Sequence, residues 1–161
     1  MATTSKNLII SFLVVIIFLI IGFFLINHFS KNLSPENIKD VGHVKIGGQT
    51  IKVDLALTPE DQSQGLSGRP PLAENEGMLF AFDHLGKFTF WMKDMNFPID
   101  IIWIGPDLHI VFIKKNASPE LYPETYRPSA NDGEAKYVLE VSSGFSEKNN
   151  LKVGDAVGFT Y

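Results

Sequence analysis

Cysteine is absent from the 161 residues of this chain. Its absence excludes a disulfide framework, a zinc–thiolate site, a thiol nucleophile and the lipid-modified cysteine of a lipoprotein. A domain without these cross-links has to be stabilised by its apolar core. The 13 phenylalanines supply bulky side chains for such a core.

Concentrated positive charge is also missing. Lys and Arg number 14 against 18 Asp and Glu, so the net charge is −4, and no basic run occurs. Residues 41–161 alone hold 11 basic and 16 acidic side chains. Nucleic acid is bound mainly through basic surfaces, and we therefore expect no nucleic-acid partner.

Motifs for metals and phosphate-bearing cofactors are lacking as well. The four histidines lie far apart, without H-x-H or H-E-x-x-H spacing. The glycine pairs in "GGQT" and "GLSG" are not followed by the G-K-[S/T] of a phosphate loop. The sequence therefore predicts no metal site and no cofactor.

One uncharged apolar run, Leu8–Ile26, stands near the amino terminus. Its 19 residues would span ~28 Å as a helix, which is about the hydrocarbon thickness of a bilayer. A cleavable signal peptide is the alternative, but its apolar region is shorter and ends in a small-x-small site, which "NHFSKN" does not offer. We favour an uncleaved membrane anchor.

This anchor divides the chain into four parts. Residues 1–7 form a short tail, 8–26 the transmembrane anchor, 27–40 a polar tether that contains Pro35, and 41–161 a globular domain. A short tail before the helix and a folded domain after it fit a single-pass protein of the cytoplasmic membrane. The domain is then expected on the outer, extracytoplasmic side, although the asymmetry in flanking positive charge is slight.

The globular domain is predicted to be mainly β. Apolar and polar residues alternate on either side of Gly47-Gly48, which predicts a hairpin. Thr58 and Pro59 begin a short helix that ends near Gly65 or Gly68, and residues 142–150 fit a second helix. Further strands are expected at 77–82, 87–92, 99–104, 109–114 and 136–141 and at the carboxyl end, with a loop at 121–133. Many short strands with two minor helices indicate a compact β-sandwich or barrel-like single domain.

Four segments of the domain resemble a known family. They are "QGLSGRPPLAENEGMLFAF", "FWMKDMNFPIDIIWI", "YVLEVSSGF" and "LKVGDAV", and together they are similar to the bacterial and archaeal family called domain of unknown function 192. Two departures are visible: Ser67 and Gly68 stand where members often have Met and an aromatic residue, and Asp94 replaces the commoner Asn. The resemblance implies a small, mostly β domain, often exported or anchored, and no established reaction.

The central motif contains a candidate ligand-binding face. In an extended strand, Trp91 shares a face with Thr89 and Lys93, while Asp94 lies on the opposite, apolar face. An aromatic ring beside a cation on a polar face is a common ligand platform. The alternative, which we favour from sequence, is that residues 121–133 or a helix cover Trp91, because large aromatic side chains are usually buried.

Two carboxylates lie among apolar residues. Asp100 shares a face with Ile102 and Ile104, and Glu140 lies in an apolar strand. A carboxylate in such surroundings needs a partner, and we expect Arg69, or failing that Lys93, to pair with Asp100. A structural salt bridge or a backbone-bonded carboxylate that stabilises the fold is preferred over catalysis. The plausible polar cluster, and the candidate ligand-binding site, thus comprises Arg69, Trp91, Lys93, Asp94, Asp100 and Glu140.

Three functions remain open. The first is a non-catalytic, membrane-anchored module that binds a small ligand or an envelope component at the Trp91/Lys93 face. The second is a hydrolase that uses two of Asp94, Asp100 and Glu140 as acid and base. The third is an interaction domain that docks a protein through an exposed aromatic patch. We favour the first.

Overall fold

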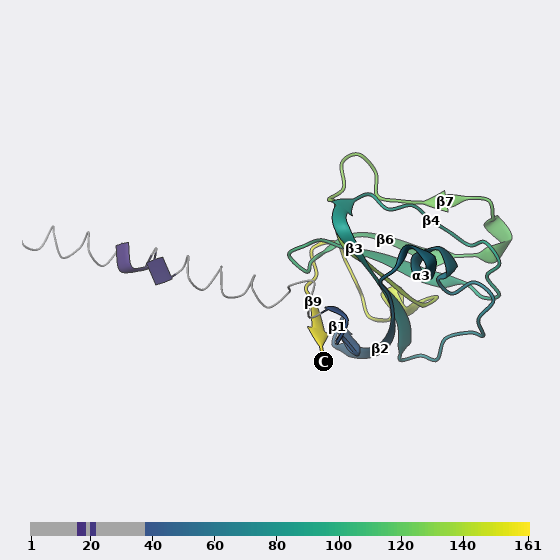
Figure 1. Ribbon diagram of the computed structural model, residues 1–161, viewed down its shortest axis with the longest axis horizontal. Coiled ribbons are helices and arrows are strands. Elements are labelled where there is room, and N and C mark those ends of the chain that lie inside the picture. Colours follow the sequence, from purple (N-terminus) through teal and green to yellow (C-terminus); the bar gives the residue numbers. More distant parts are fainter. Residues whose placement is uncertain (1–15, 19, 22–37) are drawn as a thin grey trace, which may run out of the picture. The chain divides into compact units, whose positions relative to one another are not determined.

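The computed structural model describes residues 16–18, 20–21 and 38–161 (Figure 1). The predicted tail (1–7) and most of the predicted anchor (8–26) and tether (27–40) lie outside the described residues. Residues 16–18 and 20–21 are helical. In the described part of the chain, no helix is both long and apolar enough to cross a bilayer. Ile38–Tyr161 forms one compact unit.

This unit is mainly β, as predicted. Its elements are β1 (His43–Ile46), β2 (Gln49–Ala56), α3 (Pro59–Gln64), β3 (Glu76–Gly86), β4 (Phe90–Trp91), β5 (Ile99–Ile104), β6 (Ile110–Ala117), the 3-10 helix η1 (Pro119–Leu121), β7 (Thr125–Tyr126), β8 (Ala135–Ser142), α4 (Phe145–Lys148) and β9 (Val157–Thr160). Seven strands form one sheet in the order β6-β5-β8-β3-β2-β1-β9, while β4 and β7 form a separate two-stranded sheet.

The seven-stranded sheet curls until its two edges approach each other. His109 and Ala156 form an isolated antiparallel bridge between the segments that lead into β6 and β9. The Ile110 amide donates to the Asp155 carbonyl at 3.0 Å, and the Val157 amide donates to the Leu108 carbonyl at 2.8 Å. The architecture is therefore a half-barrel. It agrees with the barrel-like form of the prediction and not with a sandwich of two packed sheets.

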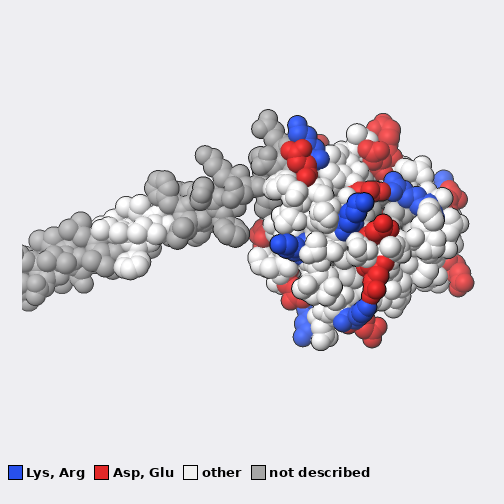
Figure 2. Space-filling model, turned by 90° about the horizontal axis from the view of Figure 1, so that it is seen from below, with Lys and Arg blue, Asp and Glu red and all other residues white. Residues whose placement is uncertain are grey.

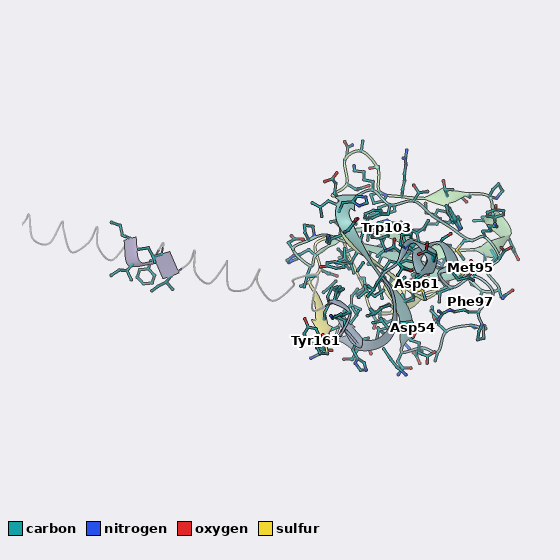
Figure 3. The ribbon with its side chains drawn as sticks, viewed as in Figure 1. Asp54, Asp61, Met95, Phe97, Trp103 and Tyr161 are labelled. Atoms are coloured by element: carbon teal, nitrogen blue, oxygen red, sulfur yellow. The ribbon has the colours of Figure 1, made fainter. Side chains whose placement is uncertain are left out.

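Alternation along the strands builds a core on each face of the sheet. The inner face of the curl is filled by side chains such as Val44, Leu79, Ile102 and Leu139. The outer face is covered by a second apolar cluster, whose buried aromatic members are Phe80, Phe90, Phe97, Trp103 and Tyr126. Figure 3 shows where Trp103, Met95 and Phe97 lie in the fold.

Local sequence signals explain the first hairpin and the first helix. Gly47 and Gly48 have φ angles of 56° and 76°, as a two-residue hairpin turn with a primed geometry requires. Thr58 is the N-cap of α3 and accepts a hydrogen bond from the Asp61 amide at 3.1 Å. Both predictions are confirmed, and α3 ends at Gly65 as expected.

The parallel pairing of β2 with β3 positions α3 over the sheet. Parallel neighbours need a crossover connection, and here the crossover runs through α3 and residues 65–75. The Gln62 side chain ties the helix down by donating to the carbonyls of Ala56, at 3.3 Å, and Ala81, at 2.9 Å. These two carbonyls belong to β2 and β3, so the helix is fixed above their outer face.

The predicted strand at 87–92 is mostly wrong. Within that range, only Phe90 and Trp91 form a strand, and they pair with Tyr126 and Thr125 of β7. The β7 strand itself lies inside the region predicted as a loop. Lys87 instead donates from its ammonium group to the carbonyls of Ser129 and Ala130. Alternation indicates an extended chain, but the length of a strand depends on its partner, and β7 has only two residues to offer.

Candidate functional site

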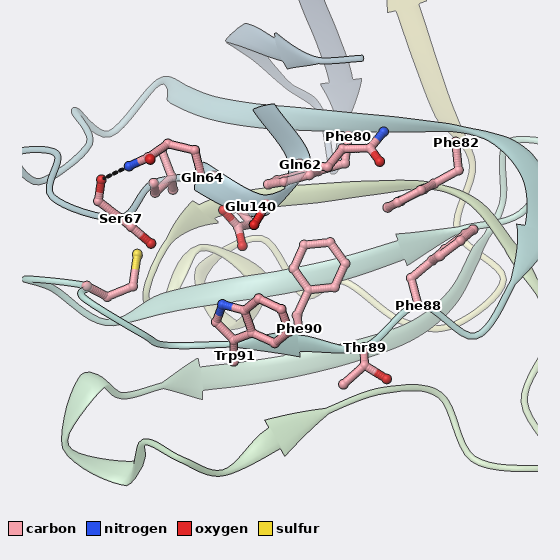
Figure 4. Close-up of a pocket in the computed structure, with 14 residues that line it drawn as sticks. Gln62, Gln64, Ser67, Phe80, Phe82, Phe88, Thr89, Phe90, Trp91 and Glu140 are labelled. Carbon is pink, nitrogen blue, oxygen red and sulfur yellow. Dashed lines mark hydrogen bonds between the residues drawn. The ribbon is translucent and has the colours of Figure 1, made fainter. Parts of the chain in front are cut away.

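A pocket of about 230 Å³ opens on the outer face of the sheet, between α3 and β4 (Figure 4). Residues from α3 and the loop that follows it form one side, β4 and Phe88 form the other, and β3 and β8 form the floor. The lining residues are Gln62, Ser63, Gln64, Gly65, Leu66, Ser67, Phe80, Phe82, Phe88, Thr89, Phe90, Trp91, Met95 and Glu140.

Glu140 reaches this pocket because of its register in β8. Its neighbours across the sheet are Met78 of β3 and Ile101 of β5, both of which belong to the outer core. Side chains directly opposite each other share a face, so Glu140 points outward with them. Figure 4 shows its carboxyl group between the α3 side, with Gln62 and Gln64, and the β4 side, with Phe90 and Trp91.

The environment of Glu140 is unusual for a carboxyl group. The residue is only 4% exposed. Its Oε2 atom is buried and has no hydrogen-bond partner among the described residues. Burial raises the pKa of Glu140 to about 8, since an ionised carboxylate would lose its hydration without gaining a compensating charge. Near neutral pH the side chain is therefore mainly protonated.

Aromatic rings form most of the pocket wall. Phe80 and Phe90 meet edge to face at 5.0 Å between ring centroids, and Phe82 stacks on Phe88 at 3.5 Å. Phe90 also packs edge to face on the buried Trp103 at 5.5 Å. The Trp103 Nε1 group donates to the Phe88 carbonyl at 2.9 Å, which fixes the chain that carries the wall.

Trp91 is 44% exposed and forms the rim of the pocket. The expectation that residues 121–133 or a helix would cover it is wrong. Within that region, β7 pairs with β4 edge to edge, so the two strands lie side by side in one small sheet, and the Trp91 side chain stays exposed. The aromatic side chain on a polar face, which the alternation indicated, is present.

Two of the family motifs meet beside the pocket. The Ser67 hydroxyl donates to the Lys93 carbonyl at 2.8 Å, and the Gly68 amide donates to the Asp94 carbonyl at 2.9 Å. The Asn96 side chain donates to the Arg69 carbonyl at 3.2 Å. These bonds join "GLSGR" to "WMKDMN" and hold the α3 side of the pocket against the β4 side.

A shallower groove of about 590 Å³ adjoins the pocket. It shares Ser63, Gln64, Ser67 and Trp91 with the pocket. Lys93 and Asp94 line this groove, and Glu60 adds a second carboxylate to it. The candidate residues Trp91, Lys93, Asp94 and Glu140 thus come together around two connected depressions.

Arg69 does not pair with Asp100. Its guanidinium contacts the carboxylate of Asp54 at 2.5 Å, on the surface. The expected pairing of Arg69 or Lys93 with Asp100 is wrong, because Asp100 is on the inner face of the sheet, where its neighbours along the strand, Ile102 and Ile104, are also buried.

Asp100 is satisfied by the backbone instead. It is fully buried and accepts hydrogen bonds from the amides of Asn116 (2.9 Å), Gly144 (3.2 Å) and Ser146 (2.8 Å). Ser146 lies in the first turn of α4, and Gly144 is its N-cap, a residue without a side chain that could cap the helix. Asp100, which lies in β5, thereby caps α4. A carboxylate bonded to the backbone is one of the two structural roles predicted for it.

Sequence reasoning missed part of the site. Gln62 lines the pocket, and its side-chain amide donates hydrogen bonds to backbone carbonyls. Phe82 lies within β3 and Phe88 follows the end of that strand, and their rings stack on each other in the pocket wall. The polar positions inside "PEDQSQGLS" offered one signal, since a helix on a sheet needs polar contacts at its edges.

Among the described residues no group of three or more His, Asp or Glu side chains could hold a metal ion.

Comparison with protein families gives one match. Residues 42–159 match the family DUF192, described as Uncharacterized ACR. This chain belongs to that family. The match spans nearly all of the compact unit and therefore includes both the pocket and the motifs beside it.

Two solved structures resemble this DUF192 domain. A protein of unknown function from Novosphingobium aromaticivorans is 30% identical, with a TM-score of 0.67 over 73% of this chain and 84% of that one. A protein from Sinorhizobium meliloti, described as a candidate transcription regulator, is 30% identical, with a TM-score of 0.64 over 73% of this chain and 92% of that one. No curated protein matches this chain.

Proposed function

We propose that the domain is a non-catalytic binding module that holds a small ligand in the pocket above Glu140. The observation that carries this proposal is a buried carboxyl oxygen, without a partner among the described residues, on the floor of an open, aromatic-lined pocket. A buried polar atom without a hydrogen bond costs free energy, and native proteins retain few of them. A ligand that bonds to Glu140 would remove that cost.

The placement of the carboxylates speaks against a hydrolase of the two-carboxylate kind. Such an enzyme needs an acid and a base within about 5–9.5 Å across one cleft. Asp100 and Glu140 point to opposite faces of the sheet, and three backbone amides already occupy Asp100. Asp94 lines the neighbouring groove and not the pocket.

The rim of the pocket favours a small ligand over a protein partner. Trp91 is exposed, but its neighbours in the groove are Ser63, Gln64 and Ser67 together with charged side chains. Protein-docking surfaces are usually built around a larger continuous apolar patch. The Trp91 ring is surrounded by polar groups and borders a cavity. This arrangement suits a small ligand that stacks on the ring.

A role in transcription, which the description of the Sinorhizobium meliloti relative suggests, receives less support. Residues 41–161 carry an acidic excess. On the face shown in Figure 2, Lys and Arg are interspersed with Asp and Glu without a basic stripe. Binding to DNA draws most of its affinity from such stripes.

The proposal also includes the location of the module. We propose that Leu8–Ile26 anchors it in the cytoplasmic membrane and that residues 41–161 face outward, on the grounds of the length and apolar character of the run.

The lack of cysteine makes a clean test possible. Val153, which is 64% exposed, is changed to cysteine, and Ser5 is changed in a second variant.

A membrane-impermeant maleimide should label the Val153→Cys protein in intact bacterial cells that produce it. The Ser5→Cys protein should react only after the membrane is opened. Recovery of the Val153→Cys protein free of the membrane fraction, or labelling with the reverse pattern, would contradict the proposed location.

Binding is tested by ligand-induced protection of Trp91. Only Trp91 of the two tryptophans is accessible, since Trp103 is fully buried. The full chain in lipid nanodiscs is screened with a library of small molecules by thermal shift, and the hits are then checked for protection of tryptophan fluorescence from iodide. A hit should lose most of its thermal shift in Trp91→Ala and keep that shift in Val153→Ala. A library without hits, or hits indifferent to Trp91, would contradict the proposal.

A further inference from the structure

The pocket above Glu140 is electrostatically one-sided. Among the described residues that line it, Glu140 is the only ionisable side chain. The other polar members, Gln62, Ser63, Gln64, Ser67 and Thr89, are neutral, and this described lining includes no Lys, Arg or His side chain. The protein therefore supplies an acid without supplying its counter-charge.

The walls of the pocket favour a positive charge too. Five of the lining residues are aromatic: Phe80, Phe82, Phe88, Phe90 and Trp91. The face of an aromatic ring carries negative electrostatic potential, and it attracts cations within about 6 Å of the ring centroid. Tryptophan is the strongest of these rings, and Trp91 is at the entrance.

The size of the pocket limits what enters it. A volume of about 230 Å³ lies below the range of about 300–1,000 Å³ that is usual for drug-sized ligands. The pocket thus suits a compact head group. The adjoining groove, whose carboxylates Glu60 and Asp94 outnumber its one lysine, Lys93, in the described part of the chain, has room for the remainder of a larger molecule.

We propose that the ligand is a small organic amine, whose ammonium group pairs with the Glu140 carboxylate while its apolar body lies against the aromatic wall. This inference rests on the proposed binding function and names the chemical class of its ligand. A buried carboxylate surrounded by rings is the arrangement by which an ammonium ion is distinguished from a neutral molecule of the same shape.

Proton balance gives the proposal a measurable signature. Burial raises the pKa of Glu140 to about 8, so below that pH the free pocket holds a neutral acid. When an ammonium ion binds, Glu140 has to release its proton to the solvent. Affinity should therefore rise with pH up to about pH 8 and level off above it until the ammonium ion itself loses its proton. A neutral ligand that accepts a hydrogen bond from the protonated acid would show the opposite trend.

The experiment compares benzylammonium with benzyl alcohol, which has nearly the same shape but no charge. Binding to the full chain in lipid nanodiscs is measured by titration calorimetry at pH 6 and pH 8, in two buffers with different ionisation enthalpies. We expect benzylammonium to bind at least about tenfold more tightly at pH 8 than at pH 6, with release of a proton, and more tightly than benzyl alcohol at pH 8.

Two variants make the comparison specific to the pocket. Glu140→Gln should lower the affinity for benzylammonium at pH 8 at least about tenfold and abolish both its pH dependence and its proton release. Trp91→Ala should weaken the binding of both compounds, and Val153→Ala should weaken neither. An unchanged unfolding temperature of ligand-free Trp91→Ala shows that any loss of binding is not a loss of folding.

The outcomes separate this inference from the proposed function. Equal binding of the two compounds, both sensitive to Trp91→Ala, would overturn the amine and leave a binding pocket. Unaltered benzylammonium binding by Glu140→Gln would overturn the amine as well. If neither compound binds, the inference fails, and if the library screen described above also finds no ligand, the proposed function fails with it.

Discussion

Glu140 and Asp100 occupy adjacent antiparallel strands, yet their carboxyl groups lie on opposite faces of the sheet. Glu140 is opposite Ile101, one residue from Asp100, and this offset by one position reverses the direction of the side chain. Asp100 receives three backbone amides, whereas Glu140 Oε2 receives none from the described residues. The Asp100 carboxylate is therefore part of the fold, whereas the Glu140 carboxyl is the group that we propose a ligand contacts.

Replacement of Asp100 tests its structural role. Asp100→Ala leaves the amides of Asn116, Gly144 and Ser146 without their acceptor in a buried region, and each buried unsatisfied group costs about 1–3 kcal/mol. We expect the free energy of unfolding to fall by about 3 kcal/mol or more, measured by urea denaturation. Asp100→Asn keeps one oxygen and should lose less. A loss below about 1 kcal/mol in Asp100→Ala would show that the amides have other acceptors.

The raised pKa of Glu140 predicts that stability depends on pH. The unfolded chain ionises this group near its ordinary value of 4.5, while the folded chain keeps the proton until about pH 8. Because the folded state binds more protons across this interval, this group's contribution to the free energy of unfolding falls as pH rises from about 4.5 to 8 and is constant above that.

The Glu140→Gln variant isolates this contribution, since glutamine does not ionise. Thermal unfolding of the full chain at pH 5 and pH 8 should show that the variant gains stability relative to the wild type as pH rises, by several kcal/mol at most. A difference between the two proteins that is constant from pH 5 to pH 8 would mean that Glu140 titrates normally.

Gly77 is expected to be intolerant of a side chain. A Cβ atom at this position would lie 2.7 Å from the Glu140 carbonyl oxygen, which belongs to the backbone of the adjacent strand. One of the two strands would have to move, at a cost of about 1–3 kcal/mol. Gly42→Ala is the matched control, because a Cβ atom at Gly42 would have no described atom within 4 Å beyond its chain neighbours. Equal stability of the two variants in denaturant would show that the β3–β8 register is more adaptable than the structure indicates.

The sequence predicted local features well, since they depend on nearby residues. The hairpin at Gly47-Gly48, the capped helix after Thr58 and the apolar strands β5 and β8 all follow from turn residues, caps and alternation. The pairing of strands is non-local. Nothing in the sequence near Phe90 indicates that its partner is Tyr126, which is why the strand predicted at 87–92 is too long.

Four of the six candidate residues lie around the pocket and the adjoining groove, whereas Arg69 and Asp100 line neither, and a ligand-binding role for the four stays a prediction. Trp91 and Glu140 line one pocket, and Lys93 and Asp94 line the groove beside it. The predicted pairing of Arg69 with Asp100 is wrong. Alternation shows which residues of one strand share a face. It does not show which of the two sheet faces a distant loop, such as the one that carries Arg69, will cover. The carboxylate that Arg69 contacts is instead that of Asp54, on the solvent side of β2.

The protonation of Glu140 is the quantity that tests this account most directly. Carbon-13 NMR of the carboxyl group, assigned by comparison with Glu140→Gln, gives its titration curve in the full chain. We predict a midpoint near pH 8 in the ligand-free protein and a lower midpoint when benzylammonium saturates the pocket. A midpoint near 4.5 in the ligand-free protein would contradict the account, because Glu140 would then already have the solvation or the partner that the pocket is proposed to obtain from its ligand.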